Sequence, residues 1–219
     1  MKIKNSYAVF GLGRYGKAVA TELVSAGADV LAVDRDPATV NAAASDLPLC
    51  KCADVTDPDV LDQLDIGDMD TVIIAMAENL EASVLATMLC KEMGVKRVIV
   101  KCSNETHRKI LTRVGADQVV FPESESGMRL AKNLLSAGFV DLIELTRDVS
   151  MLEMDVRPEW VGKNLLELNL RRRYGINVVA IRRGKEGKEI VVNIDPEKPL
   201  SQEMSLLIIA NTEKLSKLK

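Results

Sequence analysis

The chain has 219 residues, of which 47% are hydrophobic and only 3% aromatic, and its formal net charge is −3. This balance excludes the strongly basic surface of a dedicated nucleic-acid coat, so no nucleic-acid partner is expected. No apolar run reaches the ~20 residues that cross a bilayer, and no charged-then-apolar leader opens the chain. We therefore expect a soluble cytoplasmic protein of one or two domains.

Short apolar runs alternate with helix-like patterns along the first two thirds of the chain. Strands are expected over residues 6–10, 30–34, 49–53, 71–76, 97–102 and 118–121. Helices are expected after Gly16 and then over 37–45, 57–64, 79–93, 104–114 and 124–137. The expected strands are apolar almost throughout, as in a parallel sheet with helices on both faces. The pattern predicts an α/β fold with a Rossmann-type, doubly wound parallel sheet.

The strongest chemical signal is a G-x-G-x-x-G motif at Gly11, Gly13 and Gly16, between the first expected strand and its helix. Gly11 permits the tight turn, Gly13 lets a pyrophosphate approach the backbone, and Gly16 lets the helix pack against the strand. The helix N-terminus then offers free N–H groups and partial positive charge to phosphates. The motif predicts a nucleotide site, and we favour this over a glycine-rich turn that binds nothing.

Two charged residues refine the expected ligand. Asp34 lies at the end of the second expected strand, 18 residues past Gly16, where an acid accepts hydrogen bonds from ribose hydroxyls. Such an acid disfavours NADP, although Arg35 beside it weakens that inference. Arg14, inside the glycine loop, is expected to contact a terminal phosphate, which ATP has and a dinucleotide lacks. A solvated surface arginine is the alternative.

Signs of catalysis are few. The only histidine, His107, lies on the polar start of a helix after the fifth expected strand. The sequence has no G-x-S-x-G, H-E-x-x-H or P-loop lysine motif. We therefore expect a domain that binds a nucleotide without consuming it, and no enzyme.

The four cysteines are Cys50, Cys52, Cys90 and Cys102. They lie among apolar residues without the paired spacing of a zinc site. The C-x-C pair places both side chains on one face of a strand. Buried free thiols are favoured over a metal or redox site.

The composition changes near residue 139, which predicts two domains, residues 1–139 and 140–219. The second is expected to be a small α+β unit. Its expected elements are a strand-like stretch over 140–156, a turn at 157–160, a charged helix from 165 to 175, a hairpin turn at 182–187, strands over 177–181, 190–194 and 205–210, and a final Lys-rich helix. A core this thin favours packing against a second copy.

The second domain carries a basic cluster over residues 171–173. A solvated face and a shallow pocket for a phosphate-bearing ligand are equally good interpretations. The pocket would include the neighbouring Leu165, Ile176 and Pro196.

Taken together, four stretches and one acidic residue closely resemble one family. They are V-F-G-L-G-R-Y-G with the acid at position 34, A-D-V-T-D, V-I-V-K-C-S-N and F-P-E-S-E-S-G. The family is the cytosolic gating subunit of bacterial Ktr-type potassium uptake systems, which joins a TrkA-N (RCK) domain to a TrkA-C domain. The resemblance covers essentially the whole chain.

The resemblance implies a regulator that gates potassium uptake by binding ATP or ADP, with NAD(H) as a further ligand. It implies dimers that close into an octameric ring beneath a membrane-embedded channel subunit, which would hold this cytoplasmic protein at the membrane. In this family Gly11, Gly13 and Gly16 form the phosphate loop, Arg14 reads the terminal phosphate and Asp34 holds the ribose. The remaining implied nucleotide-site residues are Tyr15, Arg35, Asp54, Val55, Met76, Ala77, Glu78, Lys101, Cys102, Ser103, His107 and Glu123.

The resemblance implies two further ligands. Glu123 corresponds to a glutamate that helps hold a cation beside the phosphates, and a carboxylate suits Mg²⁺. Relatives bind cyclic di-AMP between two C-terminal domains. The corresponding positions here are Leu165, Arg171, Ile176, Asn177 and Pro196.

Two rival functions remain open from the residues alone. One is a module that senses NAD(H), and the other is an NAD-dependent oxidoreductase, which the single histidine disfavours.

Overall fold

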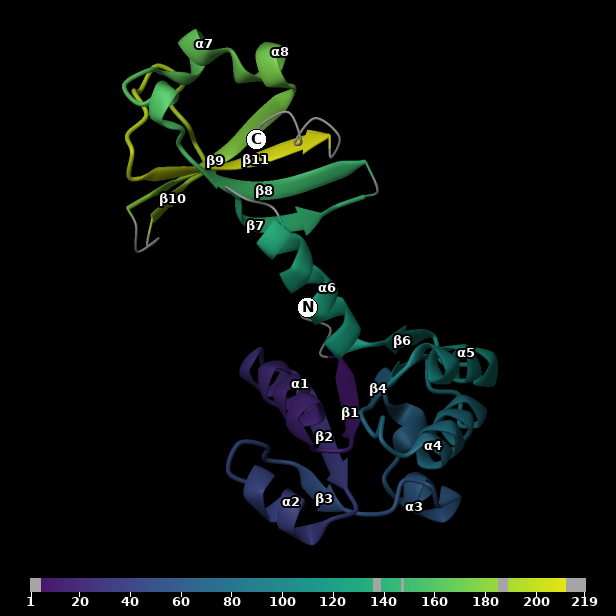
Figure 1. Ribbon diagram of the computed structural model, residues 1–219. Coiled ribbons are helices and arrows are strands. Elements are labelled where there is room, and N and C mark those ends of the chain that lie inside the picture. The colour runs from purple at the N-terminus through teal and green to yellow at the C-terminus, as the bar shows by residue number, and fades with distance from the viewer. Residues whose placement is uncertain (1–4, 136–138, 147, 185–188, 212–219) are drawn as a thin grey trace. The chain divides into compact units, whose positions relative to one another are not determined.

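The computed structural model describes residues 5–135, 139–146, 148–184 and 189–211. Contacts within the chain divide it into two compact units, Met1–Glu123 and Ser124–Lys219, and Figure 1 labels the elements of each. Most of helix α6 (Pro122–Leu135) therefore belongs to the second unit. Among the described residues, none of the helices combines the length and apolar character that crossing a bilayer requires.

The first unit is built on a six-stranded parallel sheet in the order β3-β2-β1-β4-β5-β6. The chain moves outward from β1 to β3, returns to β4 beside β1, and moves outward again to β6. This confirms the predicted doubly wound Rossmann-type sheet. The strands are β1 Ser6–Phe10, β2 Asp29–Asp34, β3 Cys50–Cys52, β4 Thr71–Ile74, β5 Arg97–Lys101 and β6 Gln118–Val120.

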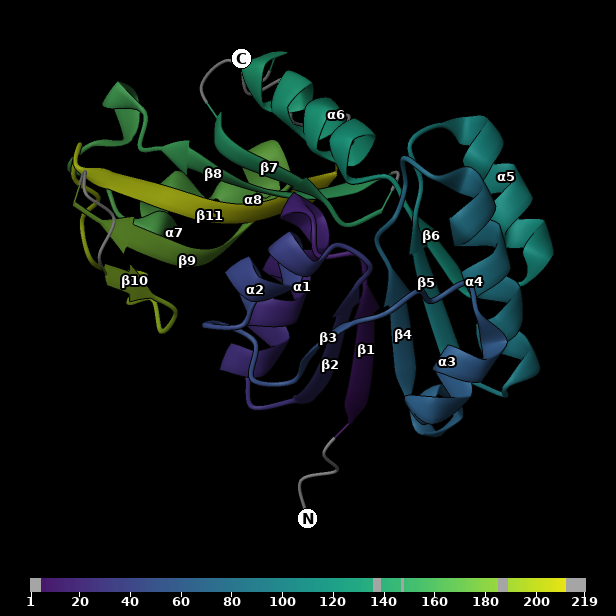
Figure 2. The ribbon, with the colours of Figure 1, turned by 90° about the horizontal axis from the view of Figure 1, so that it is seen from below.

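Helices cover both faces of this sheet, as Figure 2 shows for α1 and α2 on one side and α3, α4 and α5 on the other. The apolar strands supply both layers because successive side chains point to opposite faces. In β1, Val9 packs into the core on the α1 side, whereas Ala8 and Phe10 pack into the other core. The helices are α1 Arg14–Ser25, α2 Pro37–Ala43, α3 Pro58–Gln63, the short 3₁₀ helix η1 Ile66–Asp68, α4 Leu80–Glu92 and α5 Glu105–Val114.

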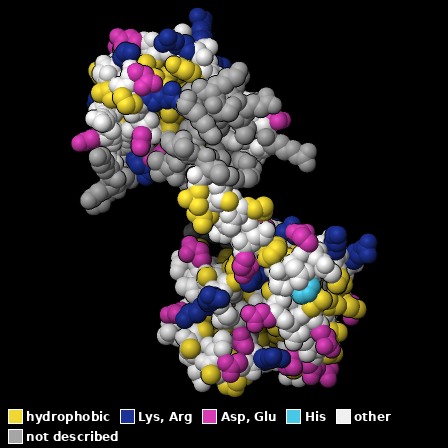
Figure 3. All heavy atoms as spheres, viewed as in Figure 1, with side chains coloured by type: hydrophobic (Ala, Val, Ile, Leu, Met, Phe, Trp, Pro, Cys, Tyr) yellow, Lys and Arg dark blue, Asp and Glu magenta, His cyan; other side chains and the backbone are white. Residues whose placement is uncertain are grey.

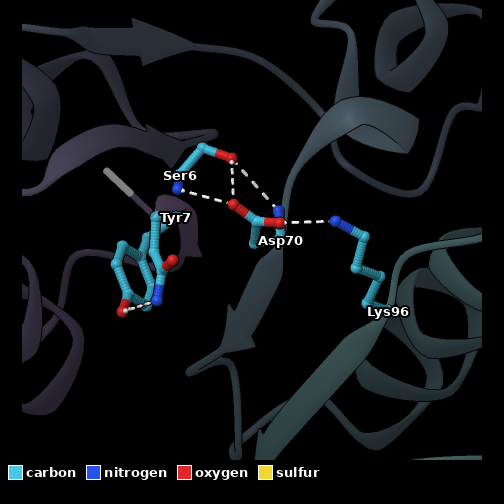
Figure 4. Close-up of polar contacts among 5 residues, drawn as sticks. Ser6, Tyr7, Asp70 and Lys96 are labelled. Carbon is cyan, nitrogen blue, oxygen red and sulfur yellow. Dashed lines mark hydrogen bonds and ion pairs between the residues drawn. The ribbon is translucent and has the colours of Figure 1, made fainter. Parts of the chain in front are cut away.

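A polar network joins three strands at the edge opposite the glycine loop (Figure 4). The carboxylate of Asp70, just before β4, accepts hydrogen bonds from the backbone N–H of Ser6 at 3.1 Å and from Lys96 Nζ at 2.7 Å. The hydrogen bond from Lys96, followed by that from Ser6, lowers the pKa of Asp70. The network aligns the starts of β1, β4 and β5.

The second unit contains a five-stranded antiparallel sheet in the order β10-β9-β11-β8-β7. Its core gathers on one face of the sheet around Trp160, Leu206 and Ile208. The strands are β7 Phe139–Glu144, β8 Val149–Asp155, β9 Ile176–Arg183, β10 Glu189–Val191 and β11 Met204–Asn211. The predicted single stretch over 140–156 is wrong, because the chain turns between β7 and β8 and pairs with itself.

The charged helix of the second unit is two short helices, α7 Leu165–Leu168 and α8 Leu170–Tyr174, instead of the one predicted. Asn169 separates them with a positive φ of 43°, a conformation that asparagine tolerates better than most residues. The 3₁₀ helix η2 Pro158–Trp160 forms the predicted turn before them. The predicted final helix and the hairpin residues 185–188 lie outside the described residues.

The cysteines are all free thiols, but only two are buried. Cys90 and Cys102 pack in the core, as predicted. Cys50 is half-buried and Cys52 is exposed, so the prediction of burial is wrong for Cys52. Both lie on β3, which forms the edge of the parallel sheet and has a neighbouring strand on one side only.

A polar network around the buried side chain of Glu153 spans three strands on the sheet face of the second unit opposite its core. The Glu153 side chain, in a residue only 8% exposed, accepts hydrogen bonds from Arg182 Nε at 2.7 Å and Nη2 at 2.9 Å, and from Ser205 Oγ. Burial alone would raise the pKa of Glu153, but the hydrogen bonds from Arg182 and Ser205 outweigh it, so the pKa is lowered.

We expect Arg182→Met to lower the free energy of unfolding near neutral pH, because it leaves the largely buried carboxylate of Glu153 without its ionic partner. The lowered pKa of Glu153 means that the stabilisation is present above its unfolded value of 4.5 and is lost as the pH falls through the folded value. The loss of unfolding free energy caused by Arg182→Met should therefore become smaller as the pH falls below 4.5. Urea unfolding at several pH values measures this. The double variant Glu153→Leu/Arg182→Met should recover most of the loss, and a pH-independent loss would contradict the assignment.

Candidate nucleotide-binding site

A cavity of about 920 Å³ opens at the carboxyl ends of the parallel strands of the first unit. It is lined by the glycine loop after β1 and by the segments that follow β2, β3 and β4. This is the switch point of the sheet, where the chain leaves β1 toward β2 on one side and β4 toward β5 on the other. Open α/β sheets bind ligands at this crevice, and the volume suits a nucleotide.

The glycine loop has the conformation that its motif predicts. Gly11 has a φ of +87°, and a Cβ atom there would meet Met76 Cγ at 2.9 Å. A Cβ atom at Gly16 would lie 1.8 Å from the carbonyl oxygen of Gly11. At Gly13, the residue before helix α1, a Cβ atom would meet nothing within 4 Å. Two of the glycines therefore allow close backbone packing, and the third leaves open space beside the helix N-terminus.

Asp34 ties the end of β2 to the glycine loop. Its Oδ2 accepts the backbone N–H of Leu12 at 2.6 Å, and its Oδ1 accepts the N–H of Asp36 at 2.9 Å. Each carboxylate oxygen can accept more than one hydrogen bond, so ribose hydroxyls can still be accommodated. On the neighbouring loop after β3, hydrogen bonds from the hydroxyl and N–H of Thr56 lower the pKa of Asp54.

The cationic side chain of Lys101 lies across the switch point from Asp34, because β5 and β2 are on opposite sides of β1. Lys101, at the end of β5, places its Nζ 2.7 Å from Glu123 Oε1 and 5.7 Å from the ring centroid of Tyr15. The Lys101 side chain is only 16% exposed, whereas that of Glu123 is 63% exposed. The hydrogen bond from Lys101 is the largest cause of a lowered pKa at Glu123, and the charge of Arg14 also lowers it.

Most of the nucleotide-site residues expected from the resemblance meet in this one cavity. Those that line it are Gly11, Gly13, Arg14, Tyr15, Asp34, Arg35, Asp54, Val55, Met76, Ala77, Glu78, Lys101 and Glu123.

Four expected residues do not line the cavity. Gly16 is buried within the first turn of helix α1, and the Cys102 side chain packs in the core. Ser103 and His107 bond to one another at the start of α5, with 2.9 Å between Ser103 Oγ and His107 Nδ1. Asn104 caps that helix, because its Oδ1 accepts a hydrogen bond from the backbone N–H of His107 at 2.9 Å.

The cavity has lining residues that the sequence analysis did not name. Ala18 follows Arg14 by one turn of α1, and Asn79 caps helix α4 through a hydrogen bond to Ala82 N at 3.0 Å. The helix-like pattern expected over residues 79–93, directly after the fourth expected strand, was the sequence signal that a second helix N-terminus, that of α4, lies at this edge of the sheet. The other unnamed residues are Val33, Ala53, Thr56, Ala75, Glu81, Ala82 and Leu85.

Of the carboxylates that line this cavity, Glu123 is the one beside Lys101 and Arg14, where phosphates are expected. The described residues hold no group of three or more His, Cys, Asp or Glu side chains able to bind a metal. Mg²⁺ commonly takes one or two carboxylates together with phosphate oxygens and waters. The exposed, ionised Glu123 fits that role only with a phosphate-bearing ligand in place.

In the second unit, the five residues expected to bind a cyclic dinucleotide are only partly brought together. The Pro196 carbonyl accepts the N–H of Leu165 at 3.1 Å, so these two residues adjoin. Arg171 and Asn177 are exposed, whereas Ile176 is 1% exposed and packs into the core.

The fold and the cavity define a Rossmann-type nucleotide-binding domain joined to a small antiparallel domain. A TrkA-N domain matches residues 7–122, and a TrkA-C domain matches residues 151–219. The chain is 37% identical over 215 residues to the Ktr system potassium uptake protein C of Bacillus subtilis, covering 98% of this chain and 96% of that protein. It is 33% identical over 217 residues to protein A of the same system, covering 99% and 96%.

The chain belongs to this family of Ktr-type potassium uptake proteins, and its role in potassium transport is regulatory. The resemblance seen in the sequence is thereby confirmed. A third relative, the Ktr system potassium uptake protein A of Vibrio alginolyticus, is 36% identical over 82% of each chain. These homologues fit a protein that is no enzyme.

Solved structures share the fold. The GsuK channel aligns with a TM-score of 0.56 at 22% identity, covering 98% of this chain but only 38% of its own. The TrkA-N domain of the inner membrane protein ybaL of Escherichia coli aligns with a TM-score of 0.55 at 15% identity, covering 61% of this chain and 99% of that domain.

Proposed function

We propose that the protein gates potassium uptake by binding ATP and ADP in the cavity of the first unit. The observation that carries this is the placement of Lys101 across the switch point from Asp34, with Arg14 at the first position of α1 near enough to act on Glu123. An adenosine held by Asp34 extends its phosphates past the N-terminus of α1 toward these two cations. The site thus distinguishes ligands by the charge at the end of the phosphate chain.

The third phosphate of ATP is the proposed switch. It adds a contact to Arg14 and brings phosphate oxygens toward Glu123, where Mg²⁺ or another cation would neutralise the shared negative charge. A ligand changes a conformational equilibrium only through different affinities for the two states. Contacts made by ATP and not by ADP supply such a difference, and typical couplings are about 1–3 kcal/mol.

Isothermal titration calorimetry with ATP, ADP and NADH on the full-length protein tests this function. We expect ATP and ADP to bind at one site per chain, with Mg²⁺ strengthening ATP binding, and NADH to bind more weakly. NADH binding much more tightly than ATP would instead support an NAD(H)-sensing module. Turnover of NAD with a hydroxy or keto compound would support an oxidoreductase and would contradict the proposal that the protein is no enzyme.

We also propose that copies of the chain assemble through α6 into dimers and then an octameric ring, which docks on a membrane-embedded potassium channel subunit from the cytoplasm. Large apolar side chains are exposed on α6, where Figure 3 shows hydrophobic surface along the segment. Leu130 and Leu134, one helical turn apart, are 60% and 76% exposed. An apolar helix face of this kind favours burial against a second copy.

Leu134→Glu is expected to shift the protein to a smaller assembly, because it places a charge in the proposed contact between copies. Size-exclusion chromatography with light scattering measures the mass. Arg129→Gln lowers the net charge by the same single unit at an exposed polar position of α6, roughly 120° around the helix from the two leucines, and is expected to leave the mass unchanged. An unchanged mass for Leu134→Glu would exclude this face from the assembly.

The second unit is proposed as a cyclic di-AMP site shared between two copies. The adjoining Leu165 and Pro196 would contact a base, and the exposed Arg171 would contact a phosphate. Because Ile176 packs into the core, it would contribute backbone groups only.

A further inference from the structure

Two thiols lie two residues apart on β3, the strand that leads into the cavity-lining residues Ala53 and Asp54, and neither thiol belongs to the site described above. Cys50 and Cys52 occupy β3, the edge strand, which lies beside α2 in Figure 1. Side chains two residues apart on a strand point to the same face, with Cα atoms about 6.6 Å apart. Their hydrogen bonds confirm the shared direction. The Cys50 thiol donates to the carbonyl of Val40 at 3.9 Å and the Cys52 thiol to that of Arg35 at 3.5 Å.

The two sulfur atoms are accessible and influence each other. Cys52 is exposed and Cys50 is half-buried. Burial is the largest cause of a raised pKa at Cys50, and the negative charges of Asp34 and an ionised Cys52 raise it further.

We propose that Cys50 and Cys52 form a two-thiolate site for a soft monovalent cation, Cu(I). Each thiol loses its proton to solvent and each thiolate donates one electron pair to the ion, so no oxidant or reductant is needed. Two metal–sulfur bonds of about 2.3 Å, as zinc forms with cysteine, join sulfur atoms about 4.6 Å apart, which rotation about χ1 can provide on this strand. Soft thiolate ligands favour Cu(I) and zinc over hard cations such as Mg²⁺.

The number of ligands separates Cu(I) from zinc. Structural zinc takes four ligands, and the described residues hold no cluster of three or more metal-binding side chains. Cu(I) is satisfied by two thiolates. The pair therefore fits the ion with the smaller coordination number.

Occupation of this site is expected to weaken nucleotide binding, a consequence that rests on the proposed function. Metal binding removes both S–H donors, including the one on the carbonyl of Arg35, a residue that lines the cavity. Cys52 pairs with Asp34 across β2 and β3, and the Ala53 N–H donates to the Asp34 carbonyl at 3.0 Å. A shift here moves the carboxylate proposed to hold the ribose.

The test is a competition for Cu(I) with the chelator bicinchoninate, under oxygen-free conditions, on the full chain. We expect one Cu(I) per chain in the wild type, and loss of binding in Cys52→Ser, whose substitution is at an exposed position. Cys90→Ala removes a buried thiol and should retain the ion. Cys50 is half-buried, so its replacement is expected to affect stability as well as copper binding, and its role as the second ligand is therefore tested on the wild type. X-ray absorption at the copper edge of the wild type should count two sulfur ligands.

Several results would overturn the proposal. In the chelator competition, these are copper binding that persists in Cys52→Ser, or a wild type that takes no Cu(I) from bicinchoninate. In X-ray absorption, it is a count of fewer than two sulfur ligands. Displacement of bound Cu(I) by an equal concentration of Zn²⁺ would also overturn it. For the coupling, ADP affinity should fall at least fivefold in the copper-loaded wild type and stay constant in Cys52→Ser. Absence of ADP binding to the metal-free protein would overturn the proposed function and the coupling, whereas the copper count would still decide the site.

Discussion

Gly16→Ala is expected to lower the free energy of unfolding of the first unit by about 3 kcal/mol and to abolish detectable ADP binding. The new Cβ atom would stand 1.8 Å from the carbonyl oxygen of Gly11 and 3.1 Å from Ala75 Cβ. The obstructing atom at Gly11 belongs to the backbone, so no side-chain rotation relieves the contact. Helix α1 must move away from the sheet, and its N–H groups leave the positions at which they face the phosphates. Urea unfolding and calorimetry with ADP measure the two effects.

Gly13→Ala is the matched control for the effect on stability, because it adds the same methyl group three residues earlier in the same glycine motif. Gly13 has a φ of −62°, and its new Cβ atom would meet nothing within 4 Å. Stability should change by less than about 0.5 kcal/mol. ADP affinity should still fall at least tenfold, or about 1.4 kcal/mol, because the methyl group occupies space reserved for phosphate. Unchanged ADP affinity in this variant would show that the phosphates do not approach Gly13.

Arg14→Ala is expected to erase the difference between ATP and ADP while leaving ADP binding nearly intact. Arg14 is exposed, lines the cavity at the first position of α1, and acts electrostatically on Glu123. A charge-assisted hydrogen bond to a terminal phosphate contributes about 1.5–3 kcal/mol, which corresponds to at least a tenfold loss of ATP affinity. Small-angle scattering of this variant should then give the same ring shape with ATP as with ADP, whereas the wild type should give a different shape with each nucleotide.

Lys17→Ala provides the control for charge. Lys17 lies on the same helix, but its Nζ is 2.8 Å from Asp46 Oδ2 and it does not line the nucleotide cavity. We expect this variant to retain the preference for ATP. Arg14→Lys should recover part of the preference, because it keeps the charge without the planar guanidinium. A ring that still changes shape with ATP in Arg14→Ala would show that another group senses the third phosphate.

Local sequence patterns predicted the first unit well because each element carries its own signals. Asp36-Pro37 and Asp57-Pro58 place a capping carboxylate before a proline, and helices α2 and α3 begin there. The second unit was predicted less well. The turn between β7 and β8 and the break at Asn169 depend on pairing and packing that short windows of sequence do not reveal.

Side-chain exposure and orientation are where the sequence was insufficient. Cys52 was expected to be buried with the other cysteines, but β3 ends the sheet and leaves its thiol exposed. The implied roles of Cys102 and His107 rested on their positions after a strand. In the structure the Cys102 side chain packs in the core, and the His107 ring bonds to Ser103.

The sequence alone determined the order of strands and helices, the phosphate-binding loop, the acid at the end of β2 and the family. These depend on residues close together in the chain, where spacing and steric demands are local. Only the tertiary structure decided that Lys101 meets Glu123 and Tyr15, and that Cys52 is exposed while Cys50, on the same strand, is half-buried. Those relations arise when strands distant in the chain become neighbours in a sheet, and no local pattern encodes which side chains then remain accessible.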